Sequence, residues 1–420
     1  MSVLFWLRFS VRLWLLTVVA MLVLSPSVAM AAVAAPQANS LSPTNYFKVI
    51  KNQVFTPGGK IYIPEGISIY GGLEDTDYME NTANLDAQIK AAAIYWHTNT
   101  VRLQVAESNL FQDPTKGQQY NQQFLDELIR EVNLARQYHQ AVVINDQTEF
   151  TNNTPLPTAM TLKFWQVMAS TFGNDPYVIF DLFNEPRLDN YRLLPTPSVK
   201  NRLRHIIFDF KPVGWGHVKP KTSKANYASI WSTWKYGGTV NGQKYIGMQS
   251  LVRTLRSSGD KNLIWVEGLF WGQQLPRGKF LLSGNNLVYS YHHINLSSPK
   301  DWQFIGRLAS NHAVVDGEWS QYQAPWQECY AKASLTSPAY LNYLHNHGVG
   351  LIAWSLQAGS LIKGTPKIIP ENNNSPSDPK RASQLQTPSH FRKNYRCNTD
   401  FGSGAGALIK QYFLLYSRPV

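Results

Sequence analysis

Short apolar, β-favouring segments alternate with helical patterns along most of this chain. Eight such segments are almost continuously apolar, as strands buried on both faces are expected to be. They are 63–70, 100–105, 141–146, 178–183, 262–267, 287–292, 313–318 and 351–356. The helical patterns are 85–96, 121–137, 158–172, 245–257, 302–309, 338–346 and 405–416. This repeated alternation predicts an α/β fold, a closed parallel (β/α)8 TIM barrel.

A doubly wound open sheet would also alternate strands with helices. That fold expects a glycine-rich phosphate-binding turn after its first strand, and no such turn follows residues 63–70. Two stretches between the predicted elements, 187–240 and 362–403, are much longer than ordinary connections. Because long insertions on a barrel usually build a binding surface, we predict that both lie on the active face.

The N-terminus has the three parts of an export signal. Arg8 and Arg12 supply basic charge, residues 13–24 form an apolar run, and residues 29–31 (Ala-Met-Ala) fit a small-x-small cleavage site. The apolar run is too short to span a bilayer comfortably, although an uncleaved anchor is the alternative reading. We therefore expect a signal peptide at 1–31, a linker at 32–50 and a single barrel domain at 51–420 in a secreted, extracellular protein.

The positive charge of the chain is scattered. The formal net charge is +12, with one modest basic cluster at 217–224 and no nucleic-acid motif beside it. We attribute this charge to solubility and to attraction towards an anionic surface, and we expect no nucleic-acid partner. No stable membrane insertion is expected once the signal is cleaved. The sequence does not fix the oligomeric state, and a monomer is the simplest expectation.

The two cysteines, Cys329 and Cys397, leave their pairing open. In an exported protein they can form a bridge between a late loop and the C-terminal segment, or remain as two thiols. The sequence has no CxxC pattern and no cluster of His and Cys with ligand spacing. A structural zinc site is therefore not expected, and we predict neither a metal nor a cofactor.

Two carboxylates stand at the ends of predicted strands. Glu185 follows the fourth strand in VIFDLFNEPR, and Glu318 ends the seventh strand in AVVDGEWSQY. The carboxyl ends of all strands in a parallel barrel meet at one face, so these two residues can lie close together. Two carboxyl groups separated by roughly 5–5.5 Å suit retaining cleavage of a glycosidic bond, in which one donates a proton and the other attacks the anomeric carbon.

Other polar and aromatic residues fall at the same level of the predicted barrel. Arg102, in the second strand, has a fixed charge that can hold a nucleophile ionised. Asn184 can bond a sugar 2-hydroxyl, and His292 can bond substrate or a catalytic carboxylate. Trp354, in the eighth strand, offers a sugar ring a flat apolar platform. Further candidates for this role, in or near predicted active-face loops, are Trp234, Trp271 and Trp319.

Glu267, at the end of the fifth strand, is a third strand-end acid. No partner motif surrounds it in the sequence, unlike Glu185 and Glu318. We therefore expect Glu267 to anchor a loop or to support the site from behind, not to react with substrate. Asp146 and Glu149, after the third strand, are likewise expected to form loop hydrogen bonds, although either can touch substrate.

The chain resembles glycoside hydrolase family 5, the cellulase family of retaining (β/α)8 enzymes. The resemblance rests on NTVRLQV, VIFDLFNEP, LVYSYHH, VVDGEW and GLIAW, which occur in family order. Its specific part is Asn-Glu-Pro after strand four combined with Gly-Glu after strand seven. The resemblance implies a glycosidase for a β-linked polysaccharide or oligosaccharide, similar to an endo-β-1,4-glucanase or mannanase. It also implies that Glu185 is the general acid/base and Glu318 the nucleophile.

Two positions depart from the family pattern. The family often has a His shortly after strand three, in an Asp-x-His pattern, where this chain has Gln147 and Thr148. It commonly has a Tyr two residues after the strand-six His, where this chain has Ile294. Both changes touch the subsite beside the cleaved bond and leave the glycan open. A barrel that binds glycan without hydrolysing it, or a transglycosylase on the same scaffold, are the alternatives.

Overall fold

The strands predicted from the sequence close into a barrel. The computed structural model describes residues 45–74, 78–111, 120–148, 154–188, 224–293, 299–319, 333–356, 361–363, 383–390 and 405–420. The barrel order is β10-β11-β12-β13-β4-β5-β6-β7, and neighbouring strands are parallel. The strands are β4 Glu65–Ile69, β5 Thr100–Val105, β6 Ala141–Asp146, β7 Val178–Asp181, β10 Leu263–Glu267, β11 Leu287–His293, β12 Val314–Trp319 and β13 Gly350–Ala353. The predicted TIM barrel is confirmed.

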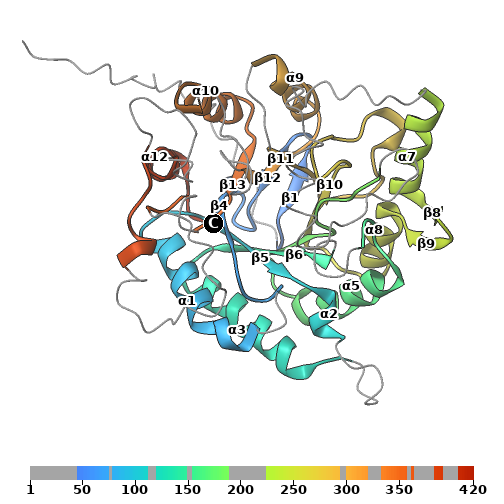
Figure 1. Cartoon of the computed structure of the whole chain (residues 1–420), viewed down its shortest axis with the longest axis horizontal. Helices are drawn as coiled ribbons and strands as arrows, with labels where there is room; N and C mark the ends of the chain where they lie inside the picture. The colour runs from blue at the N-terminus through green and yellow to red at the C-terminus, as the bar shows by residue number, and fades with distance from the viewer. Residues whose placement is uncertain are drawn as a thin grey trace, which may run out of the picture. The chain divides into compact units, whose positions relative to one another are not determined.

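Helices surround these strands in Figure 1. They are α1 Tyr78–Ile94, α2 Glu107–Leu110, α3 Gln122–Gln137, α5 Ala159–Phe172, α8 Met248–Ser257, α9 Pro299–Ala309, α10 Ala333–Asn346 and α12 Gly406–Tyr416. Local chemistry sets several of their starts: the Asn121 side chain caps α3, and Thr158 forms a capping box with Thr161 at the start of α5. Helix α10 begins before Pro338, where the sequence pattern had placed its start.

A small antiparallel sheet closes the N-terminal end of the barrel. Its strands are β1 Lys48–Ile50, β2 Gln53–Phe55 and β3 Ile61–Tyr62. Phe47 and Val54 belong to one apolar cluster with inward-facing barrel residues such as Trp265. The Tyr62 hydroxyl is hydrogen-bonded to the Thr100 hydroxyl at 2.7 Å. Residues 48–50, which we expected in a linker, are therefore part of this closure, and the opposite end of the barrel is left for a site.

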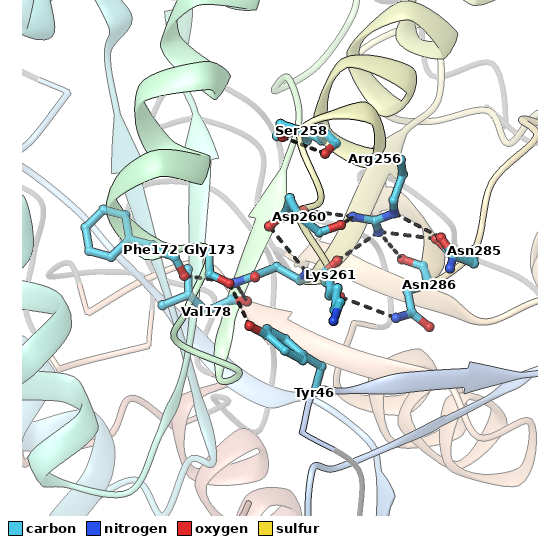
Figure 2. Close-up of polar contacts among 12 residues, drawn as sticks. Tyr46, Phe172, Gly173, Val178, Arg256, Ser258, Asp260, Lys261, Asn285 and Asn286 are labelled. Carbon is cyan, nitrogen blue, oxygen red and sulfur yellow. Dashed lines mark hydrogen bonds and ion pairs between the residues drawn. The ribbon is translucent and has the colours of Figure 1, made fainter.

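A polar network at the same end of the barrel joins the loops that lead into β10 and β11 (Figure 2). Arg256, in the last turn of α8, donates to Asp260 Oδ2 at 2.8 Å and to the carbonyl oxygen of Asn262 at 2.8 Å. Asn286 Oδ1 accepts from the backbone N–H of Val49 at 3.0 Å, which links β1 to the loop before β11. These contacts satisfy buried backbone groups where the chain turns between elements.

Side chains inside the barrel change character along the strands. Near the closed end they are apolar, and Val143, Ile179 and Trp265 pack there with the small sheet. Two residues further along β7 and β10, on the same face of each strand, come Asp181 and Glu267. The inward-facing side chains therefore become charged towards the carboxyl ends of the strands, the end where barrel active sites form.

The insertion after β7 contains structure that the sequence pattern did not reveal. It includes helix α7 Lys224–Tyr236 and the hairpin of β8 Gly237–Val240 and β9 Gln243–Ile246. Several predictions lie outside the described residues: the signal peptide, the basic cluster up to residue 223, most of 362–403, Glu149, Ile294, and both cysteines. Among the helices of the described ranges, none is long and apolar enough to cross a membrane.

Candidate active site

Glu185 lies in a turn just past β7 that is held by neighbouring strands. Its φ is 45°, a left-handed conformation that costs a residue with a Cβ about 1–2 kcal/mol. The Glu185 backbone N–H donates to Glu267 Oε2 at 2.7 Å, and the preceding N–H, of Asn184, donates to the Asp146 carbonyl at 2.8 Å. Bonds from β10 and β6 thus stabilise the turn and aim the Glu185 side chain at the mouth of the barrel.

Glu318 faces the mouth because β12 contains a bulge. Asp316 points outward, where its Oδ2 accepts from the Tyr340 hydroxyl at 2.6 Å, and in a regular strand Glu318 would point the same way. Instead, consecutive residues of β11 pair with Asp316 and Glu318, which leaves Gly317 as an extra residue. The bulge turns Glu318 inward, and Arg102 Nη1 donates to its Oε2 at 3.1 Å.

Arg102 connects four side chains at the centre of the site. Its side chain is fully buried, and Nε donates to Asp181 Oδ2 at 3.0 Å. Nη2 donates to Asn184 Oδ1 at 2.6 Å and to Glu267 Oε1 at 3.0 Å, in addition to the Nη1 bond to Glu318. Such charge-assisted bonds are the strong class of hydrogen bond, so Arg102 fixes the relative positions of four side chains from the ends of three strands, β7, β10 and β12.

His292 connects the carboxylates on the other side of the mouth. Its Nδ1 is hydrogen-bonded to Glu185 Oε1 at 3.0 Å and lies 3.8 Å from Glu318 Oε2. Its Nε2 lies 3.1 Å from Glu267 Oε1, an ion-pair distance without hydrogen-bond alignment. One oxygen of Glu185 and one of Glu318 are no more than 4.8 Å apart. The sequence-predicted pair is therefore brought together, with His292 between its members.

Exposure separates these carboxylates into two kinds. The side chains of Glu185 and Glu318 are 18% and 16% exposed, whereas those of Asp181 and Glu267 are 0% exposed. A group that reacts with substrate must be reachable from the mouth. Glu185 and Glu318 meet this requirement, and the other two carboxylates act on them from behind.

His292 and Glu267 form an ion pair. Burial would lower the pKa of His292, but the charges of Glu267 and Glu318 and the hydrogen bond to Glu185 raise it well above its ordinary value. Burial would raise the pKa of Glu267, but His292 and Arg102 lower it below its ordinary value. An imidazolium and a carboxylate are therefore both charged at neutral pH in the middle of this site.

Glu318 and Asp181 hold protons more tightly than ordinary carboxyl groups. Burial raises the pKa of Glu318 to about 7, although the positive charges of His292 and Arg102 act in the opposite direction. Burial and the charge of Glu267 raise the pKa of Asp181 to about 7. Arg102 thus acts on Glu318 as the sequence predicted, but burial has the larger effect.

The same atoms define what a cation would meet in the site. Glu185, His292 and Glu318 each offer one ligand atom within the 4.8 Å span. Against a metal stand the guanidinium of Arg102, 3.1 Å from Glu318 Oε2, and the raised pKa of His292, whose proton a metal would have to displace. The donor set therefore fits proton transfer better than it fits a resident metal.

A comparison of the sequence with protein families agrees with this arrangement of residues. The family model of cellulase, glycosyl hydrolase family 5, matches residues 70–360. The chain belongs to this family. It is a glycosidase, and the matched range contains the residues on which the resemblance rested, from Arg102 to Trp354. No curated protein shows significant sequence similarity to the chain.

Solved structures of cellulases share the fold of this glycosidase. The catalytic domain of endoglucanase Cel5A from Thermobifida fusca is 12% identical with a TM-score of 0.53, over 88% of this chain and 97% of that one. A β-glucanase from Saccharophagus degradans is 14% identical with a TM-score of 0.53, over 90% and 94%. A family 5 cellulase from an Icelandic hot spring isolate is 18% identical with a TM-score of 0.51, over 91% and 98%.

The tryptophans predicted to bind sugar differ in what they offer. Trp354 is half-buried and meets the ring of Tyr70 edge-on, with centroids 5.4 Å apart, and Trp271 is also half-buried. Trp319 is 1% exposed and belongs to the apolar cluster that the outward-facing strand residues form with the helices. This contradicts the expectation that its ring lines the site. Trp234 is fully buried, and its Nε1 donates to the Glu267 carbonyl at 3.0 Å, so it supports β10 instead.

The strand-three departure from the family pattern has a structural consequence. Thr148 is fully buried, its hydroxyl bonds to Asp146 Oδ1, and it accepts from the Glu107 backbone N–H at 3.1 Å. It therefore stabilises the loop and does not face the mouth as a family histidine would. Gln147 is 8% exposed at the same turn.

Sequence reasoning missed one member of the glycosidase site, Asp181, and gave a second one, Glu267, the supporting place that the structure shows. Asp181 lies within the apolar fourth strand, and Glu267 was expected only to anchor or support. The available signal was positional: an acid in a strand buried on both faces needs a charged partner, and Arg102 is the strand residue that can supply one. Which acids meet that arginine depends on the closure of the barrel.

Proposed function

We propose that this glycosidase is a secreted retaining hydrolase of β-1,4-linked glucans or mannans. The observation that carries the proposal is the separation of at most 4.8 Å between an oxygen of Glu185 and one of Glu318. Retaining enzymes place their two carboxyl groups about 5–5.5 Å apart, whereas inverting enzymes need about 6.5–9.5 Å to admit a water. The short separation favours direct attack by a carboxylate.

In the first step, the Glu318 carboxylate forms a bond to the anomeric carbon while the glycosidic carbon–oxygen bond breaks. Glu185 gives its proton to the leaving oxygen, so the departing sugar leaves as a neutral alcohol and a glycosyl ester of Glu318 remains. In the second step, the Glu185 carboxylate takes a proton from water, whose oxygen bonds to the anomeric carbon. The ester bond breaks, and its electron pair returns to Glu318.

The neighbouring residues have assigned roles in this proposal. Arg102 orients Glu318 and opposes its protonation. Since Asn184 Oδ1 accepts from Arg102, its amide Nδ2 is the group that would donate to the sugar 2-hydroxyl. Trp354 and Trp271, both half-buried, are the proposed ring platforms. The Thermobifida and Saccharophagus structures contain cellotetraose, which supports a β-glucan as the first substrate to test.

The test compares Glu185→Gln and Glu318→Gln with the parent on soluble β-glucan, carboxymethylcellulose and mannan. We expect kcat to fall about 10²–10⁴-fold for Glu185→Gln and below detection for Glu318→Gln, because each loses a group that exchanges a proton or forms a bond. Asp126→Asn, on the exposed surface of α3, is the control and should keep parent turnover.

The stereochemistry of the first product gives an independent readout. Proton NMR of early products should show the β-anomer released before mutarotation. Release of the α-anomer, or parent turnover in both glutamine variants, would overturn the mechanism. Binding to glycan with no sugar release would favour the non-hydrolytic barrel. The start of the exported protein, expected at Ala32, is checked by N-terminal sequencing.

A further inference from the structure

The carboxylate of Glu267 contacts the backbone of Glu185 and also His292, the residue that is hydrogen-bonded to the Glu185 side chain. Its Oε2 accepts from the Glu185 backbone N–H at 2.7 Å. Its Oε1 accepts from Arg102 Nη2 at 3.0 Å and lies 3.1 Å from His292 Nε2, while His292 Nδ1 bonds to the Glu185 carboxyl at 3.0 Å. Glu267 therefore holds Glu185 twice, through its main chain and through His292.

The segment that follows Glu267 strengthens this arrangement. Phe270, Trp271 and Gly272 have φ values of 60°, 57° and 70°, three consecutive left-handed residues of which two carry a Cβ. In this conformation the Trp271 N–H donates to the Pro186 carbonyl at 3.3 Å, and the Gly272 carbonyl accepts from the His292 N–H at 3.0 Å. The segment thus contacts the turn that carries Glu185 and the strand that carries His292.

Neutralising the charge of Arg102 does not by itself explain why Glu267 is buried in this position. Asp181, also fully buried, bonds Arg102 at 3.0 Å, and Glu318 does so at 3.1 Å. Within the described part of the chain, no hydrogen bond joins Asp181 to Glu185 or to His292. Asp181 is therefore a matched comparison: it is a buried carboxylate on the same guanidinium without the link to Glu185.

We propose that Glu267 is a positioning residue for proton transfer, fixing both the backbone turn that presents Glu185 and the imidazole that orients its carboxyl group. The inference rests on the proposed role of Glu185 as general acid/base. Glu267 itself is 0% exposed and does not meet the substrate. Glu267 acts on Glu185, the group that protonates the leaving oxygen. The loss of rate on removing Glu267 should therefore be larger for a leaving group that needs a proton.

The first experiment measures kcat and kcat/KM of Glu267→Gln and Asp181→Asn on a soluble β-glucan and on 2,4-dinitrophenyl β-cellobioside. The dinitrophenolate leaves without protonation, whereas a sugar does not. We expect Glu267→Gln to lower kcat on glucan about 100-fold, which is the scale of a small misplacement of a catalytic group. On the activated substrate, kcat/KM reports formation of the glycosyl-enzyme, and we expect it to fall less than about 10-fold. Asp181→Asn should affect both substrates equally.

A second readout does not depend on turnover. Histidine NMR titration, with the His292 signal assigned by His292→Ala, should show that the pKa of His292 falls in Glu267→Gln because a neighbouring negative charge is lost. Glu65→Gln is the control: it removes another fully buried carboxyl, in β4 at the closed end of the barrel, and should leave this titration and the turnover unchanged.

If Glu267→Gln does not fold, Gly272→Ala tests the same link without changing a charge. A Cβ on Gly272 would lie 2.9 Å from His292 Cγ, so the imidazole must shift and the leaving-group-dependent loss should reappear. Equal losses on both substrates, or an unmoved His292 titration, would overturn the proposal. Parent protein that cleaves no glycan, with the His292 titration shifted as expected, would defeat the hydrolase proposal and leave the Glu267–His292 link standing.

Discussion

Two arginines organise opposite ends of the barrel in different ways. Arg256, at the closed end, is bonded to one carboxylate, that of Asp260, and to the carbonyl oxygen of Asn285 (Figure 2). It also bonds to the carbonyl oxygen of Asn262. Arg102, at the mouth, is bonded only to side chains in the described part of the chain, and three of its four partners are carboxylates. One arginine binds mainly backbone, and the other binds titratable groups.

This difference in partners separates stability from chemistry. A carbonyl oxygen does not titrate, so most hydrogen bonds of Arg256 do not change with pH. They hold the loops at the closed end. Around Arg102, burial and neighbouring carboxylates raise the pKa of Glu318 and of Asp181 to about 7, so these groups exchange protons near neutrality. A barrel of this kind is expected to be stabilised at the closed end and to carry its chemistry at the carboxyl ends of the strands.

The largest expected effect comes from Arg102→Met. Removing one partner of a buried ionic network leaves its carboxylates without compensation, so we expect the free energy of unfolding to fall by about 3–5 kcal/mol. Turnover should be lost or nearly lost, and any residual activity should have its acid limb at higher pH, because the pKa of Glu318 rises when the opposing charge is removed. Urea unfolding and a pH profile of kcat/KM measure both. An unchanged acid limb would contradict the role given to Arg102.

Arg256→Met should have a smaller effect of a different kind. It removes charge-assisted hydrogen bonds at the closed end, and because the guanidinium is partly exposed we expect the free energy of unfolding to fall by only about 2–3 kcal/mol. At 25 °C kcat and its pH profile should match those of the parent. A changed pH profile in this variant would break the contrast between the two ends.

The smallest effect is the change of the free energy of unfolding over a single pH unit near neutrality. Burial raises the pKa of Asp260 to about 6, and burial with the charge of Glu267 raises that of Asp181 to about 7, from an ordinary value of 3.8. Since the folded state then binds the proton more tightly, stability is highest below the ordinary pKa and is lost as pH rises through the folded pKa. Each group contributes up to about 1.4 kcal/mol per pH unit within its window.

Between pH 6 and 7 the contribution of Asp260 should therefore be largely complete, whereas that of Asp181 should still change with pH. Asp181→Asn should reduce the fall of unfolding free energy in that range. The remaining slope comes from the other carboxyl groups whose pKa is raised, namely Glu318, Glu107, Glu131 and Glu65. Asp260→Asn should flatten the fall mainly below pH 6. Urea unfolding at half-unit steps from pH 4.5 to 8 makes the comparison, and an unchanged slope between pH 6 and 7 in Asp181→Asn would contradict it.

The direction of the Glu318 side chain shows a limit of prediction from the sequence. The spacing of strands placed Glu185 and Glu318 at one face, yet the alternation of side chains along β12 would have put Glu318 on the same side as Asp316. The bulge at Gly317 reverses this, and it depends on pairing with β11. The strands of the small N-terminal sheet are two or three residues long, too short to produce a readable period.

The sequence by itself determined the barrel, the two reachable glutamates and Arg102, because a strand buried on both faces leaves an apolar run that a polar residue visibly interrupts. The tertiary structure alone decided which buried acids meet that arginine, that Trp319 packs outward, and that Glu267 reaches the backbone of Glu185. The physical reason is that burial and charge depend on neighbours from other strands, and closure of the barrel brings those neighbours together.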